Sequence, residues 1–503
     1  MINNCRFNKI IFKINILIIF IFSIYYSLKK MLEKKSKKLL KENRIENEEK
    51  DDKFYKEKRK EYIIKGLISL FSCIVHTLGY FSVWTLGNYV VYLISFRRNY
   101  NQNLTFSYGY FLFPIMNFSL SLSSPIGGVL EDKIGGKKAI FLSTMIIYTS
   151  FSIMYFSRNI FFDYALMILN GIGMAIGINI PRKNVCSFFM NNQALVCGII
   201  SLVPGLLSAF LNIFNEKYIL NPLSESPTIE NLYYEEKIYL NFQKLLLFEI
   251  AFLIVICFIT LATYIQNNPK ETIKYGFGEN VNESQDSKKT KKKNKKNEVS
   301  KELKIKKAIY NIRAVKLFLM IFLFFPTINF VNNTWRPIGI YYKINTYYLQ
   351  LIGAFYSIIG CISSVIFALV GDKIQFRILF VVFAVLLTFS SFTFPMSFKN
   401  DIFFVCKIMI ISFVLNGFNI IIDPHMMKVY GMENYIEIGG AIRSSAGICE
   451  IASVIFAFYL ENNYSGSKNY VYNFIYMISG CTNLISLFLG IFENDEKFDY
   501  YNK

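Results

Sequence analysis

The sequence predicts an all-α membrane protein in which twelve transmembrane helices form two bundles of six. Three observations lead to this prediction. Apolar residues account for 53% of the chain, and they gather in runs of about 18 to 25 residues, the length of helix that crosses about 30 Å of hydrocarbon. The runs lack the alternation of barrel strands, so their backbone amides must be satisfied within helices. They also fall into two sets, separated by one long polar stretch.

Twelve apolar spans follow one another along the chain. They cover residues 66–95, 107–130, 139–157, 162–181, 194–214, 244–265, 315–334, 347–370, 378–397, 402–423, 439–460 and 471–492. The short connections after the second, fourth, eighth and tenth spans carry lysine and arginine, and the positive-inside rule assigns such connections to the cytosol. Arg97 and Arg98 are basic residues on the other face. Both termini are therefore expected in the cytosol.

The order of these spans predicts five segments. They are an N-terminal segment with a candidate signal anchor and a charged tail at 1–62, a six-helix bundle at 63–265, a basic cytosolic loop at 266–314, a second six-helix bundle at 315–492, and a cytosolic tail at 493–503. The apolar stretch at 10–28 follows basic residues and has no clear cleavage site after it. Residues 1–30 are a signal, an extra helix or an extension of the gene model, and the sequence leaves these alternatives open.

The formal net charge of +20 comes mainly from two polar segments, 29–62 and 266–316. The lysine-rich stretch Lys288–Lys296 has low complexity, which is typical of a solvated loop beside anionic lipid and not of a folded nucleic-acid surface. The nine cysteines are scattered without a CxxC pair, so they are expected to be small buried side chains. Membrane lipid is an expected partner, whereas nucleic acid, a bound metal and a cofactor are not expected.

An internal repeat relates the two halves of the chain. Ser123–Ile126 and Asp132–Ile134 recur with identical spacing as Ser363–Ile366 and Asp372–Ile374, each time between the second and third spans of a half. A second match follows in the same order: Asn170-Gly171 with Asn416-Gly417, and Pro181 with Pro424. Two ordered matches favour a duplicated six-helix unit, which is a common origin of transporter folds.

The connection after the second span carries a recognisable signature. It fits the pattern G-x3-D-[RK]-x-G-x-[RK]-[RK] at every fixed position, with Gly128, Asp132, Lys133, Gly135, Lys137 and Lys138. On this motif and its place in the chain, the sequence resembles the major facilitator superfamily. The resemblance implies the twelve-helix fold of that superfamily and secondary transport of a small solute by alternating access.

The signature residues have readable physical roles. Gly128 lets two helices approach closely, and Gly135 permits a tight reversal with positive φ. Asp132 is expected to pair with a cation or with the positive N-terminal end of the eleventh helix, near Ile438–Gly439. The resemblance implies that Asp132 latches the two bundles in one conformation, and a solvated turn is the alternative. The second copy supplies further latch candidates: Asp372, Lys373 and Arg377.

A narrower resemblance lies in the first span. It contains the pattern G-N-x3-Y-x2-S-[YF]-x-R at residues 87–98, which is similar to the monocarboxylate transporter and oxalate/formate antiporter branch. This resemblance implies a monocarboxylate or another small organic anion as the solute. Members of that branch place an arginine in the eighth helix, but this span, Tyr347–Val370, has no ionisable side chain except tyrosine. An amino acid, a vitamin or a non-transporting solute sensor remain the alternatives.

Five polar residues within the spans are candidates for the substrate or proton pathway, because an ionisable group in hydrocarbon must pair or line water. They are Arg443, Glu450, His76, Asn88 and Lys407. Arg443 and Glu450 are seven residues apart and therefore lie on nearly the same helix face. One of them could bind an anionic group while the other neutralises it or carries a proton. The alternative for each candidate is structural: an ion pair, a buried histidine or an interhelical hydrogen bond.

These features together predict a monomeric secondary transporter and not an enzyme. A proton or solute gradient would drive transport, because the sequence holds no G-x4-G-K-[ST] loop for a nucleotide. A membrane-embedded transferase is the competing class, and it would need a histidine–carboxylate cluster. Neither His76 nor His425 has an acidic neighbour of that kind in sequence. The protein is expected in the plasma membrane or an organelle membrane.

Overall fold

A computed structural model of the chain describes residues 49–101, 104, 106–214, 236–268, 271, 305, 308–344, 346–463 and 468–493. The chain divides after Glu61 into two compact units. Every contact described below lies inside the second unit, Tyr62–Lys503. The apolar stretch at 10–28, the lysine-rich stretch and the tail from residue 494 lie outside the described residues.

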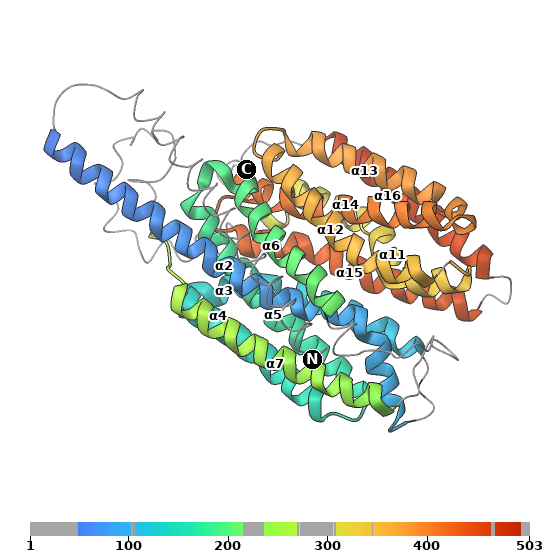
Figure 1. Cartoon of the computed structure of the whole chain (residues 1–503). Coiled ribbons are helices and arrows are strands. Elements are labelled where there is room, and N and C mark those ends of the chain that lie inside the picture. The colour runs from blue at the N-terminus through green and yellow to red at the C-terminus, as the bar shows by residue number, and fades with distance from the viewer. Residues whose placement is uncertain are drawn as a thin grey trace, which may run out of the picture. The chain divides into compact units, whose positions relative to one another are not determined.

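Six long helices form the first half of the second unit. They are α2 (Glu49–Arg98, which begins in the first unit), α3 (Leu112–Ile134), α4 (Gly136–Phe156), α5 (Ile160–Phe188), α6 (Gln193–Phe214) and α7 (Glu236–Thr263). A short 3-10 helix, η1 (Phe106–Phe111), precedes α3. Figure 1 shows α4 and α7 side by side, and these two helices are in contact.

The second half also contains six spans, of which the first is broken. They are α10 (Ile312–Phe324) with α11 (Pro326–Tyr341), α12 (Thr346–Val370), α13 (Phe376–Thr393), α14 (Asp401–Tyr430), α15 (Tyr435–Asn463) and α16 (Lys468–Ile491). A 3-10 turn, η5 (Phe394–Lys399), follows α13. The break at Phe325 precedes Pro326, because proline has no N–H for a helical hydrogen bond and clashes with the preceding turn.

The lengths and composition of these helices fit a lipid environment. Among the described residues, ten helices are long and apolar enough to cross a membrane. The remaining two spans are α3, which is rich in serine, and α12, whose described apolar part is shorter. Large apolar side chains on the outer helices are exposed, such as Phe258 on α7 (72%) and Phe389 on α13 (64%). The chain is an integral, multi-pass membrane protein.

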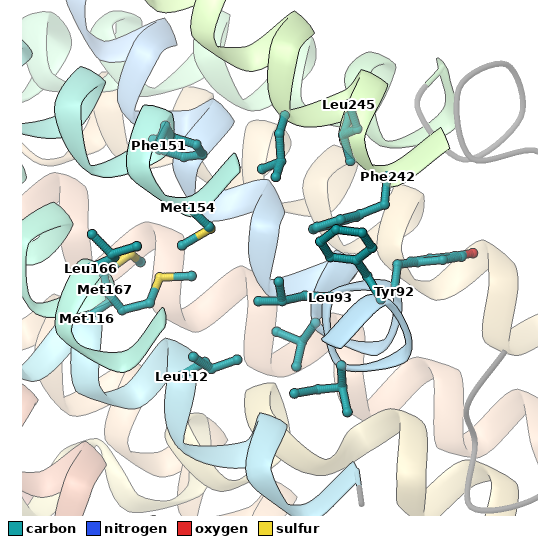
Figure 2. Packing of buried hydrophobic residues seen from close by; sticks show 14 of the residues in the cluster. Tyr92, Leu93, Leu112, Met116, Phe151, Met154, Leu166, Met167, Phe242 and Leu245 are labelled. Carbon is teal, nitrogen blue, oxygen red and sulfur yellow. The ribbon is translucent and has the colours of Figure 1, made fainter. Parts of the chain in front are cut away.

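Five helices of the first half converge on one apolar cluster, shown in Figure 2. Its side chains are buried and are mostly Leu, Met and Phe from α2, α3, α4, α5 and α7: Leu93, Met116, Phe151, Met167 and Leu245. Lipid tails are as apolar as these side chains, so close packing and dispersion, not exclusion of water, hold such a cluster together.

A buried ion pair joins α2 to α5 in the first half, near this cluster. Arg97, at the end of α2, donates to both carboxylate oxygens of Asp163 in α5, at 2.6 and 2.9 Å, and both side chains are fully buried. A third guanidinium hydrogen bond, of 2.8 Å, reaches the carbonyl oxygen of Met154. This pairing explains why one basic residue is found on the face where the sequence predicts few.

Several helices extend further than the sequence predicts, and two of them, α5 and α14, continue past a proline. The fourth and tenth spans were expected to end at residues 181 and 423, but α5 continues to Phe188 and α14 to Tyr430. Pro181 and Pro424 lie inside these helices, where each removes one backbone hydrogen bond without ending the helix. The extra turns carry charged residues that sequence analysis assigned to loops.

Both signature loops lie at one end of the helices, which we call the signature-loop end. Two contacts place the long central connection there as well. A methyl group added at Gly136, which follows the first signature loop, would collide with the hydroxyl of Tyr264 just after α7. Lys316, in the first turns of α10, pairs with Glu493 after α16. The other end of the helices, where Asn159 caps α5, is called the opposite end.

Candidate functional site

The two halves meet along two pairs of helices. In the first pair, α15 lies against α3, and two glycines of α15 make the approach close. A methyl group added at Gly440 would lie 2.8 Å from the backbone nitrogen of Pro125. One added at Gly447, two helical turns further on, would lie 2.6 Å from Cβ of Ser121. Small residues at such spacing allow helix backbones to pack together in a membrane.

The second pair, α6 and α12, repeats this arrangement. A methyl group added at Gly198 would lie 2.9 Å from the carbonyl oxygen of Ser364, and one added at Gly205 would lie 2.8 Å from Sγ of Cys361. Each glycine has its counterpart 242 positions later, at Gly440 and Gly447. The interface between the halves is therefore built twice from the same pattern, as expected for a duplicated six-helix unit.

The second signature loop closes this interface at the signature-loop end. The carboxylate of Asp372 accepts hydrogen bonds from the backbone N–H groups of Ala194 (2.9 Å) and Leu195 (3.2 Å), at the N-terminus of α6. An anion at this position satisfies helix N–H groups that have no partner within the helix, and it interacts favourably with the helix dipole. The sequence analysis predicted this type of contact for Asp132.

The first signature loop has a different geometry. Asp132 is exposed in the last turn of α3, and the carboxyl group of Glu437, in the first turn of α15, lies against Gly128. A methyl group at Gly128 would lie 2.8 Å from Cδ of Glu437, at the far end of a flexible side chain. Gly135 has φ of 83°, as expected for the reversal. The basic signature residues are exposed at this end: Lys133, Lys137, Lys138, Lys373 and Arg377.

A buried carboxylate joins the two halves at the same end. Asp423 in α14 is fully buried and accepts a 2.5 Å hydrogen bond from Arg182 of α5. The hydroxyl of Tyr435 donates to its other oxygen at 2.6 Å, and Arg443 of α15 forms an ion pair with it. Three helices from both halves thus share one negative charge. Sequence analysis missed this cluster because Arg182 falls just after the predicted fourth span, which ends at 181, and Asp423 falls at the very end of the predicted tenth span.

Glu450 lies further along α15, away from these charges. Its side chain is buried, and its Oε1 accepts a 3.1 Å hydrogen bond from the amide of Asn117 in α3. The side chain of Asn333 in α11 lies beside the same carboxyl group. On the preceding residue of α11, the amide oxygen of Asn332 accepts a 2.9 Å hydrogen bond from the hydroxyl of Tyr356 in α12. Both halves therefore contribute to a layer of amides around one acid.

At the opposite end, an aromatic contact joins η1, which precedes α3, to α15. The ring of Phe111, at the end of η1, meets the ring of Phe458 in α15 edge to face, with centroids 5.4 Å apart. Glu450 consequently lies between ionic contacts at one end and an aromatic contact at the other. Contacts between the two halves therefore lie on both sides of Glu450 along α15.

Three other candidates lie away from this layer or outside the described side chains. The ammonium of Lys407 bonds the hydroxyl of Thr393 and stands 4.8 Å from the ring centroid of Phe389, within the second half. His76 packs edge to face against Tyr80 within the first half, at a centroid distance of 4.6 Å. The side chain of Asn88 lies outside the described residues. Arg443 and Glu450 do not pair with each other, because Asp423 takes the charge of Arg443.

The structure reveals a histidine–carboxylate pair that the sequence did not suggest. Nε2 of His425 in α14 lies 3.7 Å from Glu493, and the imidazole stacks on Phe376 at 4.0 Å. Lys316 and Arg313 of α10 also pair with Glu493, at 2.7 and 3.3 Å. This cluster fastens α10, α14 and the end of α16 together at the signature-loop end. It lies within one half, so it is not part of the interface.

Comparison with solved structures identifies the architecture. The human organic anion transporter MFSD10 aligns with a TM-score of 0.58 and 9% identity, over 84% of this chain and 98% of that chain. A D-xylose-proton symporter aligns with a TM-score of 0.59 and 14% identity, over 85% and 97%. The chain has the major facilitator fold. A second structure, of the proton:xylose symporter XylE, agrees, with a TM-score of 0.58 and 11% identity over 86% and 95%.

The major facilitator fold is therefore established by structure and not by sequence. No protein-family model matches this chain, and no curated protein matches it. Identities of 9–14% show that the fold is shared and do not show which solute is bound. The narrower resemblance to the monocarboxylate and oxalate/formate branch stays a prediction.

Proposed function

We propose that this protein is a secondary transporter that moves a small polar solute along the interface between its two halves. The observation that carries the proposal is the position of Glu450, a buried acid between two closures that both depend on α15. The major facilitator fold supports it, since the neighbouring structures are described as an organic anion transporter and a xylose-proton symporter. The fold also favours a transporter over a membrane-embedded enzyme.

The contacts at the signature-loop end suit a reversible closure. Asp423 and Asp372 join the halves through ion pairs and hydrogen bonds, which water can replace when the end opens. A buried ion pair gains little net stability, because desolvation offsets most of the attraction. Closed and open arrangements of such an end can therefore differ by only a few kcal/mol, which a bound solute can overcome.

Glu450 provides the coupling site in this proposal. A buried carboxyl group with amide neighbours can hold a proton, or give it up to a solute or to water when one end opens. Asn117 and the adjacent amides of α11 would bind hydroxyl or amine groups of the solute. We therefore favour proton-coupled transport of a neutral or cationic polar solute.

A monocarboxylate or another small organic anion is the second candidate. The sequence resemblance supports it, and MFSD10 is described as an organic anion transporter. A carboxylate needs a basic partner, and Arg443 is already paired with Asp423. An anion would then require protonated Glu450, so its uptake should depend strongly on an inward proton gradient.

Reconstituted full-length protein tests the proposal. Uptake into proteoliposomes is measured for sugars, amines, amino acids, vitamins and monocarboxylates, with and without a pH gradient. We expect one class to be taken up, with a gradient dependence that Glu450→Gln removes. Glu433→Gln, at an exposed position, is the control. A solute that binds without counterflow would indicate a sensor, and unchanged gradient dependence in Glu450→Gln would contradict the coupling role.

A further inference from the structure

Two cysteine side chains face each other near the junction of α5 and α6. Cys186 lies in the last turn of α5 and Cys197 in the second turn of α6, and their Sγ atoms are 3.7 Å apart. Both side chains are buried, with exposures of 0% and 1%. A disulfide bond is about 2.05 Å long, so the two sulfur atoms are about 1.7 Å from bonding distance.

Charged side chains of the interface act on this pair. Arg182 lies one helical turn before Cys186, and the charges of Arg182 and Arg443 both act on Cys197. Burial of the thiol and the charge of Asp372 act on Cys197 in the opposite sense. Arginine side chains stabilise the thiolate, which is the form that reacts with oxidants. Cys197 is therefore the better placed nucleophile of the two.

We propose that Cys186 and Cys197 form an oxidation-sensitive pair that a peroxide converts into an intramolecular disulfide. The thiolate of Cys197 attacks a peroxide oxygen, the O–O bond breaks, and the products are a sulfenic acid and hydroxide, which takes up the thiol proton as water. The thiol of Cys186 then attacks the sulfenic sulfur, forming the S–S bond and releasing a second water. Two thiols and one hydrogen peroxide thus give one disulfide and two waters.

The disulfide would act on the closure at the signature-loop end. Cys197 follows Ala194 by one helical turn, and the N–H groups of Ala194 and Leu195 hold the carboxylate of Asp372. Drawing Cys197 toward α5 would move this turn of α6 relative to Asp372. This consequence rests on the proposed transport function, whereas the thiol chemistry does not.

Access to the pair should depend on conformation. In the closed arrangement both sulfur atoms are buried beside Arg182, which is bound to Asp423 across the interface. Opening of the signature-loop end separates these groups and admits the oxidant. Weakening the closure with Asp423→Asn should therefore accelerate oxidation of the pair.

The experiment uses the full-length protein in proteoliposomes, with the exposed thiols of Cys406 and Cys481 changed to serine. Hydrogen peroxide is added, free thiols are blocked with N-ethylmaleimide, and the digest is analysed by mass spectrometry. We expect a cross-linked peptide containing Cys186 and Cys197 that dithiothreitol reverses. It should form faster in Asp423→Asn, persist in the buried-thiol control Cys449→Ser, and disappear in Cys197→Ser.

Two results would overturn the proposal. Absence of the cross-linked peptide, both in the parent protein and in Asp423→Asn, would exclude the thiol pair as an oxidation site. If the cross-link forms and solute uptake is unchanged, the disulfide does not act on the closure at the signature-loop end. Cys186→Ser provides a second variant if Cys197→Ser does not fold. Because the cross-link is read by mass, failure of the transport proposal would be recognised separately.

Discussion

Arg182 of the first half donates a 2.5 Å hydrogen bond to Asp423 of the second half, 241 positions later in the chain. The pair connects α5 to α14, and Asp423 also holds Tyr435 and Arg443. Removal of one partner from a buried pair leaves an uncompensated charge, whereas separation of both into water does not. This relationship is therefore suited to a contact that forms and breaks in the proposed transport cycle.

Asp423→Asn should weaken closure of the signature-loop end. It leaves the charges of Arg182 and Arg443 close together without an anion, and we expect a loss on the order of 3 kcal/mol in the closed state. Thermal unfolding in detergent and maleimide labelling of interface cysteines measure this change. A double-mutant cycle with Arg182→Gln should give a coupling energy of about 0.5–3 kcal/mol. Additive effects would contradict a direct contact.

Asp372→Asn should destabilise the closed signature-loop end, whereas Asp132→Asn should slow turnover. Asp372 binds two N–H groups at the start of α6, so its charge should contribute about 0.3–1 kcal/mol to the closed state. We expect Asp372→Asn to increase maleimide labelling of cysteines at the signature-loop end.

Asp132→Asn is predicted from the sequence to slow turnover more than it weakens solute binding. Unchanged flux in Asp132→Asn would contradict its role as a latch.

Sequence analysis predicted much of the fold because the membrane imposes simple rules on composition and length. It placed twelve spans, and it anticipated the reversal with positive φ at Gly135. It could not predict how far α5 and α14 continue, because Pro181 and Pro424 usually end a helix in water but are tolerated within a membrane protein.

The candidate site was harder to predict, because partners come together only in three dimensions. Arg443 and Glu450 share a helix face, which suggested a joint role, yet Arg443 pairs with Asp423 from another helix. His425 and Glu493 are 68 positions apart and meet only because α14 packs near the end of α16. The glycine pairs of α6 and α15 were a usable signal, since their spacing of seven residues is identical.

Gly440→Ala should destabilise the protein, and Gly353→Ala should not. The added methyl group at Gly440 meets the backbone of Ser124 and Pro125, which cannot move aside, so we expect a loss of about 1–3 kcal/mol. At Gly353 no atom lies within 4 Å of the added group. Alanine there should stabilise the helix by up to about 1 kcal/mol. Equal melting temperatures for the two variants would contradict close packing of α3 and α15.

Glu493 should make the fold of the second half sensitive to acid. Burial alone would raise the pKa of its carboxyl group, but hydrogen bonds and charges of His425 and Lys316 lower the pKa below the ordinary value. Because the folded state binds this proton less readily, the stabilisation is present above about pH 4.3 and is lost as pH falls through the lower, folded-state pKa.

Thermal unfolding in detergent as a function of pH tests this expectation. Glu493→Gln should reduce stability near neutral pH and flatten the acid side of the profile. Glu433→Gln, at an exposed position, should leave the profile unchanged. An identical acid limb in Glu493→Gln and the parent protein would show that other groups govern acid stability.

Arg443→Gln distinguishes a structural role from a role in solute binding. The ion pair with Asp423 predicts that the variant slows transport of every solute, because closure is weakened. The expectation from sequence was a loss confined to anionic solutes. Uptake of one neutral and one anionic solute, compared in the same variant, decides between these roles. Loss of anion uptake alone would indicate that Arg443 binds the solute.

The central claim is that the two halves exchange closure between their ends. Double electron–electron resonance measures the distances between spin labels at the two ends directly. One label pair, at Lys138 and Lys428, reports on the signature-loop end. The other, at Arg158 and Lys399, reports on the opposite end, and all four positions are exposed. We predict that Asp423→Asn lengthens the first distance and shortens the second. A single unchanged distance distribution at both ends, in the parent protein and the variant, would contradict the account.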